Sequence, residues 1–246
     1  DEVQLSCEDA GSADPADVVR NCCAAASAGA GFVGLHDGAG RAQPGRWAEL
    51  VARVAERCPG VVLSVRCHDD LGLAVAGTLA GVAAGSGQVE CSVNGVGARA
   101  GTAALEEVVA ALLVRRDHFR AETGVDAGEL AAASRLVADR TGCLVPPNKA
   151  VVGANAFAHE AGIHQDGMLK DERTYQILDP RAVGARMTLP LGKHSGRHAF
   201  ARACSARGVK LAGEELNAAF RRFKSLADGG RAVALDELFD YQGVNA

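Results

Sequence analysis

The chain has 246 residues and a formal net charge of −4, and 48% of its residues are hydrophobic against 23% charged. This balance predicts a globular protein with one sizeable core or two smaller ones. Acidic and basic residues are interleaved, and no apolar run reaches the roughly 20 residues of a membrane helix, so we expect neither nucleic-acid nor membrane partners. The eight cysteines are scattered, with no Cys-x-x-Cys pair and no signal peptide before them, which favours reduced thiols in the cytoplasm.

Four segments in the first half of the chain share one plan: a short β-rich run, a polar or glycine turn, then an Ala/Leu/Val stretch with helical spacing. The runs are Val3 to Cys7, Gly31 to Leu35, Val61 to Val65 and Gln88 to Val93. The unit recurs about every 30 residues, which is the length of a βα repeat. The carboxyl ends of the runs are followed by polar residues: Glu8, Asp37, His68 and Asn94.

Consecutive βα units predict parallel strands, with the chemistry at their carboxyl ends. Either a doubly wound open sheet or part of a (β/α)8 barrel fits this pattern. No Gly-x-Gly-x-x-Gly turn follows the first run, and the glycines of "GVGARAG", residues 95–101, follow the fourth. We therefore favour an α/β fold in the form of a partial TIM barrel.

The repeat ends near Arg116, and a helix is predicted from Gly128 to Thr141. The "VPPNK" turn then opens a second region, whose last part from Gly213 through Phe239 has the pattern of two amphipathic helices. Residues with the spacing of a buried face are Leu216, Phe220, Phe223 and Leu226. We expect a partial barrel over residues 1–118, then a linker and a mainly helical subdomain over 119–246.

The stretch "SVRCHDDLG", residues 64–72, places Arg66 two positions before His68 at the end of the third run. Residues two apart on a strand face the same side. A guanidinium is thus predicted beside an imidazole at the carboxyl edge of the sheet.

Long motifs in one order carry a resemblance to a known family: "CHDDLGLA" from Cys67, "GQVECSVNGVGARAGTAALEEVV" from Gly87, "PPNKAVVGANAFAHEAGIHQDGMLKD" from Pro146 and "LGKHSGRHAF" from Leu191. The chain closely resembles the 2-isopropylmalate synthases and the related homocitrate and citramalate synthases. These are DRE-TIM metallolyases, so the resemblance implies barrel strands equivalent to the fifth through eighth, then a helical subdomain, without the family's regulatory domain.

The resemblance implies a Claisen condensation of acetyl-CoA with a 2-oxoacid, 3-methyl-2-oxobutanoate being the expected one, in leucine biosynthesis. The family uses a divalent metal, Mn2+ or Mg2+, which polarises the carbonyl that is attacked. The matching positions imply catalytic roles for Glu8, His164 and Tyr175, with His164 delivered from a neighbouring subunit. They imply metal binding by His68 and substrate binding in the loop residues Asn94, Gly97, Arg99 and Gly101.

The sequence departs from the family pattern on its catalytic face. Arg66 stands where the family has its first metal-binding histidine, and a guanidinium cannot be a ligand because it stays protonated. Two interpretations remain open: Arg66 disables the metal site, or it binds the oxoacid carboxylate in the metal's place. The other departures are Gly38 for threonine, Ala98 for glutamate, Thr102 for asparagine and His36 for proline.

Four strands cannot close a barrel, and their two outer strands leave backbone groups unpaired. We expect a partner: an amino-terminal half barrel, a separate chain carrying one, or a second copy in a homo-oligomer. Two functions remain open, an acyltransferase of the 2-isopropylmalate synthase type that is inactive as this chain alone, and a non-catalytic relative that binds a ligand or a synthase subunit.

Overall fold

The computed structural model describes residues 2–160, 164, 167–168, 170–171, 174–188, 190–193, 195–228 and 238. These form two compact units, residues 1–153 with 182–184, and residues 154–181 with 185–246. Among the described residues, no helix is long and apolar enough to cross a membrane.

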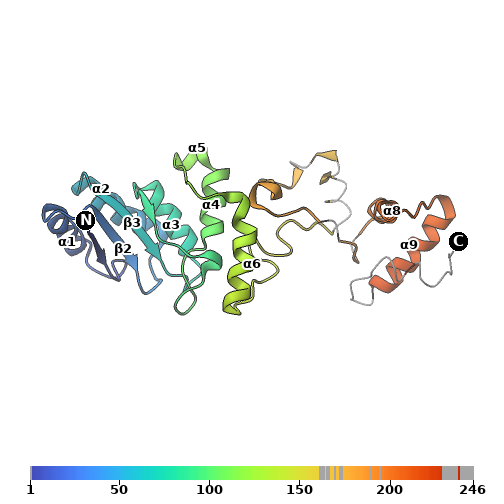
Figure 1. Cartoon of the computed structure of the whole chain (residues 1–246), viewed down its shortest axis with the longest axis horizontal. Coiled ribbons are helices and arrows are strands. Elements are labelled where there is room, and N and C mark those ends of the chain that lie inside the picture. Colours follow the sequence, from blue (N-terminus) through green and yellow to red (C-terminus); the bar gives the residue numbers. More distant parts are fainter. Residues whose placement is uncertain are drawn as a thin grey trace. The chain divides into compact units, whose positions relative to one another are not determined.

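The first unit is built on a four-stranded parallel sheet in the order β1-β2-β3-β4. Figure 1 shows its helices following one another along the chain beside the strands. Its elements are β1 (Gln4–Cys7), α1 (Pro15–Ser27), β2 (Phe32–Asp37), α2 (Pro44–Arg57), β3 (Val62–Cys67), α3 (Ala74–Ala83), β4 (Gln88–Val89), η1 (Val93–Gly95), α4 (Leu105–Val114), α5 (Arg116–Phe119), η2 (Ala127–Glu129), α6 (Leu130–Thr141) and η4 (Pro180–Val183).

The βα pattern follows from local signals. Asp14 caps α1 by accepting a hydrogen bond from the Ala16 amide at 2.8 Å, and Pro15 opens the first turn with a backbone already shaped for a helix. Pro44 opens α2 in the same way. At the other end of the unit, α6 stops at Gly142, whose φ of 73° is the left-handed conformation typical of a helix end.

One face of the sheet packs against the helices. Alternate strand residues such as Val33, Leu35 and Val65 are fully buried there against Trp47 and Val51 of α2. Because strand side chains alternate between faces, the residues between them point to the opposite side. That opposite face is polar, so this sheet has an apolar face under its helices and a polar face without them.

Two strands are longer than expected and two are shorter, since β1 begins one residue later than expected, at Gln4. β2 continues to Asp37 and β3 to Cys67, so that His36 and Arg66 are register partners on neighbouring strands. The fourth strand, expected over residues 88–93, ends at Val89. The chain stays extended to Ser92, which bridges to Ala104, and it turns at Asn94 and Gly95, which both have positive φ, at 60° and 70°.

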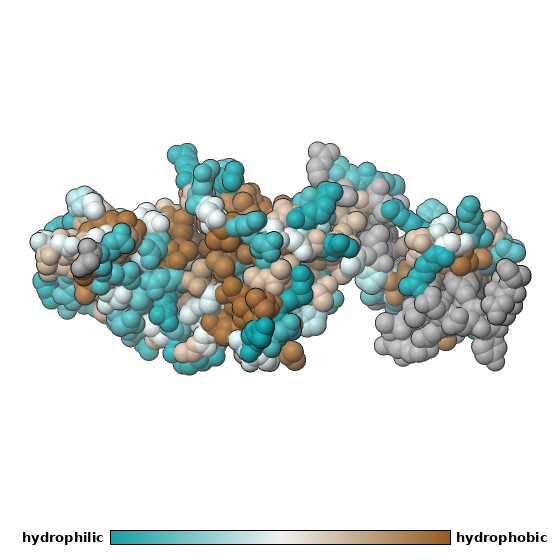
Figure 2. Space-filling view, in the orientation of Figure 1, coloured by the Kyte–Doolittle hydropathy of each residue, from teal (hydrophilic) through white to brown (hydrophobic). Residues whose placement is uncertain are grey.

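The first unit also extends beyond the boundary expected at residue 118, because side chains join the later segment to the sheet end. The Asn94 Nδ2 group donates to the Ser134 carbonyl of α6 at 2.9 Å, and Lys149 Nζ lies 2.5 Å from Glu107 Oε1. Figure 2 shows apolar side chains gathered over α4 and α6. Leu136 of α6 is 56% exposed.

The second unit includes α8 (Arg197–Ala206) and α9 (Gly213–Ala227). Their contact is aromatic: Phe200 and Phe223 are fully buried with ring centroids 5.1 Å apart, and Phe220 lies 5.6 Å from Phe200. Leu216 and Leu226 pack against this cluster, which confirms the predicted buried face. The second helix expected before Phe239 lies almost wholly outside the described residues.

Candidate functional site

The polar face of the sheet is a connected network near the carboxyl ends of the strands. His36 is 4% exposed and lies between two carboxylates, with Nδ1 2.8 Å from Glu8 Oε1 and Nε2 3.3 Å from Glu90 Oε1. A neutral imidazole carries one N–H only, so both contacts are hydrogen bonds when the ring is protonated. The face can therefore hold a proton shared between a histidine and two acids.

Glu90 is the centre of this network. Gln4 Nε2 and Ser64 Oγ each donate to its Oε1 at 3.1 Å. Partial burial acts to raise the pKa of Glu90, but the hydrogen bond from Gln4 and the charge of His36 outweigh it, and the pKa lies below its usual range. Glu90 is thus held as a carboxylate on this face.

Arg66 lies on the same face, next to His36 in the parallel ladder. Its neighbours Val65 and Cys67 point into the core, so its own side chain points to the polar side. Within the described part of the chain, Arg66 makes no hydrogen bond or ion pair. A half-buried cation on this face is therefore available to an anion.

His68 follows β3 and is 7% exposed, with Nδ1 3.2 Å from the Asp37 carbonyl oxygen. It also forms an isolated antiparallel bridge with Thr102, and the Asp69 amide donates to the Gly101 carbonyl at 2.9 Å. The loop after β4 is thereby fastened to the end of β3. The structure brings the "CHDDLG" and "NGVGARAG" motifs together at one edge of the sheet.

The loop residues are engaged within the protein. Arg99 forms a two-pronged ion pair with Asp70, at 2.6 and 2.8 Å, and its Nη2 also donates to the Gly38 carbonyl at 2.7 Å. The hydrogen bond from Arg99 is the main reason that the pKa of Asp70 is lowered. Asn94 directs its amide to Ser134, whose hydroxyl donates back to Asn94 Oδ1 at 2.5 Å.

The glycines of the loop have a geometric role. Gly101 has a φ of 94°, and a Cβ added there would overlap the Gly95 carbonyl oxygen. A Cβ added at Gly97 would lie 3.3 Å from the Gly101 Cα. The two sides of the loop therefore lie so close together that a Cβ at Gly97 or Gly101 would displace the backbone opposite.

His164 and Tyr175, both in the second unit, lie side by side with ring centroids 4.5 Å apart. Both side chains are exposed, Tyr175 by 46%. The remainder of the "GIHQDG" segment lies largely outside the described residues. These two rings form a pair available for contact with a ligand.

The described residues do not fit a divalent metal. No group of three His, Cys, Asp or Glu side chains among them is placed to hold one. Arg66 lies two residues before His68 and brings a permanent positive charge beside it. These residues by themselves therefore do not form a site for a divalent metal.

Several members of the polar network are not among the expected site residues. Gln4, Ser64 and Glu90 are bonded across strands, and Gln4 and Glu90 are 86 residues apart in sequence. The available signal was the alternation of polar with apolar residues along each strand. It indicates a polar face, but it does not identify which residues on that face meet.

Comparison with known proteins agrees with this arrangement. The HMGL-like family model matches residues 1–137, and a model described as homocitrate synthase post-HMGL domain-like matches residues 151–231. The 2-isopropylmalate synthase of Pyrococcus furiosus is 51% identical over 97% of this chain, and that of Pelotomaculum thermopropionicum is 47% identical over 96%. The chain spans about half the length of these curated relatives, 48% of each.

A solved structure supports the fold. The HMG-CoA lyase of Bacillus subtilis has a TM-score of 0.52 at 20% sequence identity, over 59% of this chain and 51% of the lyase. At this identity the similarity establishes the shared α/β architecture alone. Together with the family matches and the two motif loops fastened at one sheet edge, it places the chain in the HMGL-like family, among the relatives of the 2-isopropylmalate synthases.

Proposed function

We propose that the chain is a region of a 2-isopropylmalate synthase-type acyltransferase acting in leucine biosynthesis in the cytoplasm. In the proposed reaction the acetyl-CoA methyl carbon loses a proton and attacks the keto carbon of 3-methyl-2-oxobutanoate. Water then cleaves the thioester and releases the CoA thiol. The observation that supports this most is identity of about half the residues over nearly the whole chain.

Arg66 is assigned to the carboxylate of the 2-oxoacid. A guanidinium binds a carboxylate through two parallel N–H groups, and this one has no partner within the described residues. Glu8 is assigned an acid–base role beside His36, and His164 with Tyr175 a catalytic role in the site of a neighbouring subunit. Arg99 and Asn94 contribute by holding the loop, because their polar groups are already bonded to Asp70 and Ser134.

A complete barrel requires four further βα units, because the four strands of this sheet do not close on themselves. We assign these units to an amino-terminal half barrel of the same protein, to a separate chain that carries one, or to a second copy of this chain. The proposed partner covers the two edge strands β1 and β4.

A second candidate function is favoured by one observation, the unpaired Arg66 at the position of a metal ligand. In this case the chain is a non-catalytic relative that binds a 2-oxoacid or a synthase subunit. Homocitrate synthase-like and citramalate synthase-like activities differ from the first proposal only in the 2-oxoacid accepted.

Thiol release from acetyl-CoA separates these functions. The 246-residue chain is assayed alone and with the amino-terminal half of a relative supplied as a second chain, using branched, dicarboxylic and three-carbon 2-oxoacids. We expect no release from the chain alone, and release with the branched acid once the second chain is present and Arg66 is retained. Release only when Arg66→His, Gly38→Thr and Ala98→Glu are combined would remove Arg66 from the oxoacid carboxylate. Activity of the unmodified pair would exclude the non-catalytic function, whereas inactivity of every combination would refute the acyltransferase proposal.

The role of Arg66 is tested by calorimetry with 3-methyl-2-oxobutanoate in the absence of metal. Arg66→Met should weaken binding about tenfold to a hundredfold, because a hydrogen-bonded ion pair is worth roughly 1.5–3 kcal/mol. Arg135→Met, which changes an exposed arginine of α6, is the matched control and should leave the affinity unchanged. Equal affinity of both variants would remove Arg66 from the site.

A further inference from the structure

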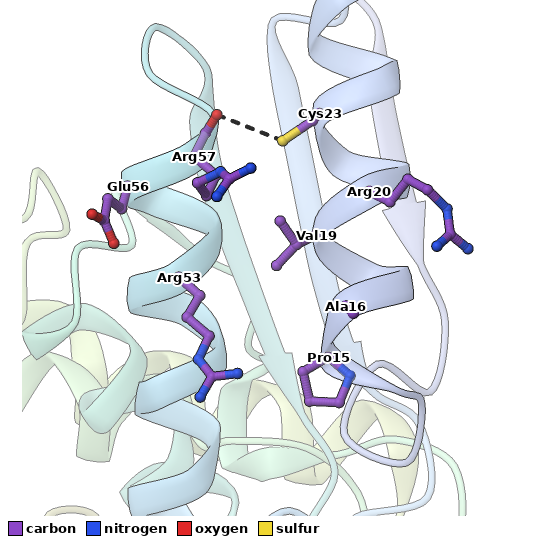
Figure 3. A pocket seen from close by; sticks show the side chains of 8 residues that line it. All are labelled: Pro15, Ala16, Val19, Arg20, Cys23, Arg53, Glu56 and Arg57. Atoms are coloured by element: carbon purple, nitrogen blue, oxygen red, sulfur yellow. Dashed lines mark hydrogen bonds between the residues drawn. The ribbon is translucent and has the colours of Figure 1, made fainter.

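Two cysteines on neighbouring helices meet on the side of the sheet away from the polar face. Cys23 lies in α1 and Cys58 directly follows α2, and their sulfur atoms are 3.0 Å apart. A disulfide has about 2.05 Å between its sulfurs, so closing this gap takes a movement of about 1 Å. Cys23 also lies 3.5 Å from the Arg57 carbonyl oxygen, the contact drawn in Figure 3.

Cys23 lines a groove between α1 and α2 with a volume of about 530 Å³, which is within the size range of small-molecule sites. Figure 3 shows Cys23 near one end of the groove, with Val19 directed toward α2 and Arg53 further along. The groove therefore offers a thiol at one end of a space that a small molecule can enter.

The groove is positively charged. Three of its lining residues are arginines, Arg20, Arg53 and Arg57, and one is an acid, Glu56. Arg20 is paired with Asp17 at 2.6 Å, whereas the side chains of Arg53 and Arg57 form no ion pair within the described ranges. With Arg20 paired to Asp17, two guanidinium groups against one carboxylate leave the lining with a net positive charge, which favours an anionic reactant.

The two thiols differ in access. Cys58 is 4% exposed, and burial raises its pKa to about 12, whereas Cys23 is half-buried and faces the groove. The accessible thiol therefore reacts first, and the buried one reacts only with its neighbour.

We propose that Cys23 and Cys58 are a reversible dithiol–disulfide pair that reduces the disulfide of an anionic low-molecular-mass thiol bound in the arginine-lined groove. The Cys23 thiolate attacks one sulfur of the small disulfide, whose S–S bond breaks and whose first thiolate leaves and takes up a proton. The Cys58 thiolate then attacks the Cys23 sulfur and displaces the second thiolate. Two protein thiols are oxidised to one disulfide, and one small disulfide is reduced to two thiols.

A second pair of cysteines provides the internal comparison. Cys7 of β1 and Cys22 of α1 have sulfurs 3.8 Å apart, and Cys22 is fully buried. Neither lines the groove. Adjacent positions of one helix thus carry a groove-facing thiol and a core-facing thiol.

The test uses the full chain with Cys143→Ser, which removes an exposed cysteine. Oxidised glutathione is the anionic probe and cystamine is the cationic one, and the products are mapped by peptide mass spectrometry after alkylation. With oxidised glutathione we expect a Cys23–Cys58 disulfide, and in Cys58→Ser a glutathione mixed disulfide on Cys23. Cys22→Ser is the matched control and should react as the parent does.

Charge recognition is tested with Arg53→Gln combined with Arg57→Gln. This variant should react about tenfold more slowly with oxidised glutathione and no more slowly with cystamine, as expected when local charge concentrates an anion. Circular dichroism confirms that each variant is folded. Modification of other cysteines in preference to Cys23, or equal slowing with both probes, would overturn the proposal.

Discussion

Replacing Gly101 by alanine should destabilise the first unit more than any other single-methyl change in the loop after β4. Gly101 has a φ of 94°, and the added Cβ would overlap the Gly95 carbonyl oxygen. That oxygen accepts the Thr102 amide at 3.0 Å, so the backbone cannot move away without lengthening this hydrogen bond. The left-handed conformation costs about 1–2 kcal/mol for an L-residue, and loss of the hydrogen bond adds about 0.5–1.5 kcal/mol.

We therefore expect the free energy of unfolding to fall by about 2–3 kcal/mol in Gly101→Ala. Urea unfolding followed by the fluorescence of Trp47 measures it, because Trp47 is the chain's single tryptophan and is 1% exposed in the core of the first unit. Two variants separate the causes. Gly72 has a φ of 70°, and a Cβ added there would have no described atom within 4 Å. Gly97 does not have a positive φ, but a Cβ added there would lie close to Gly101.

Gly72→Ala should cost about 1 kcal/mol from conformation alone, and Gly97→Ala less than that. The reasoning fails if Gly101→Ala unfolds at the same urea concentration as Gly72→Ala, since the overlap with Gly95 would then contribute nothing.

Two further expectations concern the core of each unit. Phe223→Ala should lower the stability of the second unit by about 3–5 kcal/mol, because the fully buried ring of Phe223 packs against Phe200. Far-UV circular dichroism during urea unfolding measures this loss. An unfolding midpoint equal to that of the parent would contradict it. Burial raises the pKa of Glu106. The parent should therefore lose stability as pH rises from the ordinary glutamate pKa of about 4.3 toward the higher pKa of the folded state. Glu106→Gln has no group to titrate at this position and should not lose that stability. The stability of Glu106→Gln relative to the parent should therefore increase between pH 4 and pH 7 in urea unfolding, and a difference independent of pH would refute the assignment.

Local signals in the sequence were sufficient for the order and type of the elements. Periodicity located all four strands, and the helix predicted at 128–141 is found as α6 from Leu130 to Thr141, with the 3-10 turn η2 before it. Periodicity overestimated the fourth strand, whose pairing with β3 ends at Val89 although the chain is still extended at Ser92. It also placed the end of the first region too early, since the bond between Asn94 and Ser134 joins segments 40 residues apart.

The candidate site was only partly visible in the sequence. The positions of Glu8, Arg66 and His68 at strand ends follow from the repeat, and their proposed roles come from family resemblance. The bonds from His36 and Gln4 to Glu90 depend on strands being side by side, which no local pattern specifies. The contact between His164 and Tyr175 likewise joins residues with no regular spacing.

Arg99 also contributes to how the loops after β2, β3 and β4 move. Its guanidinium joins three successive βα connections, because it lies after β4 and bonds Asp70 after β3 and the Gly38 carbonyl after β2. The contacts of His68 with Asp37 and Thr102 and the bond from Asp69 to Gly101 join the same loops, so their backbone amides should exchange with solvent deuterium at similar rates. A ligand that displaced Asp70 from Arg99 would remove one of several contacts, so the loops over the polar face should stay together until the other contacts also break.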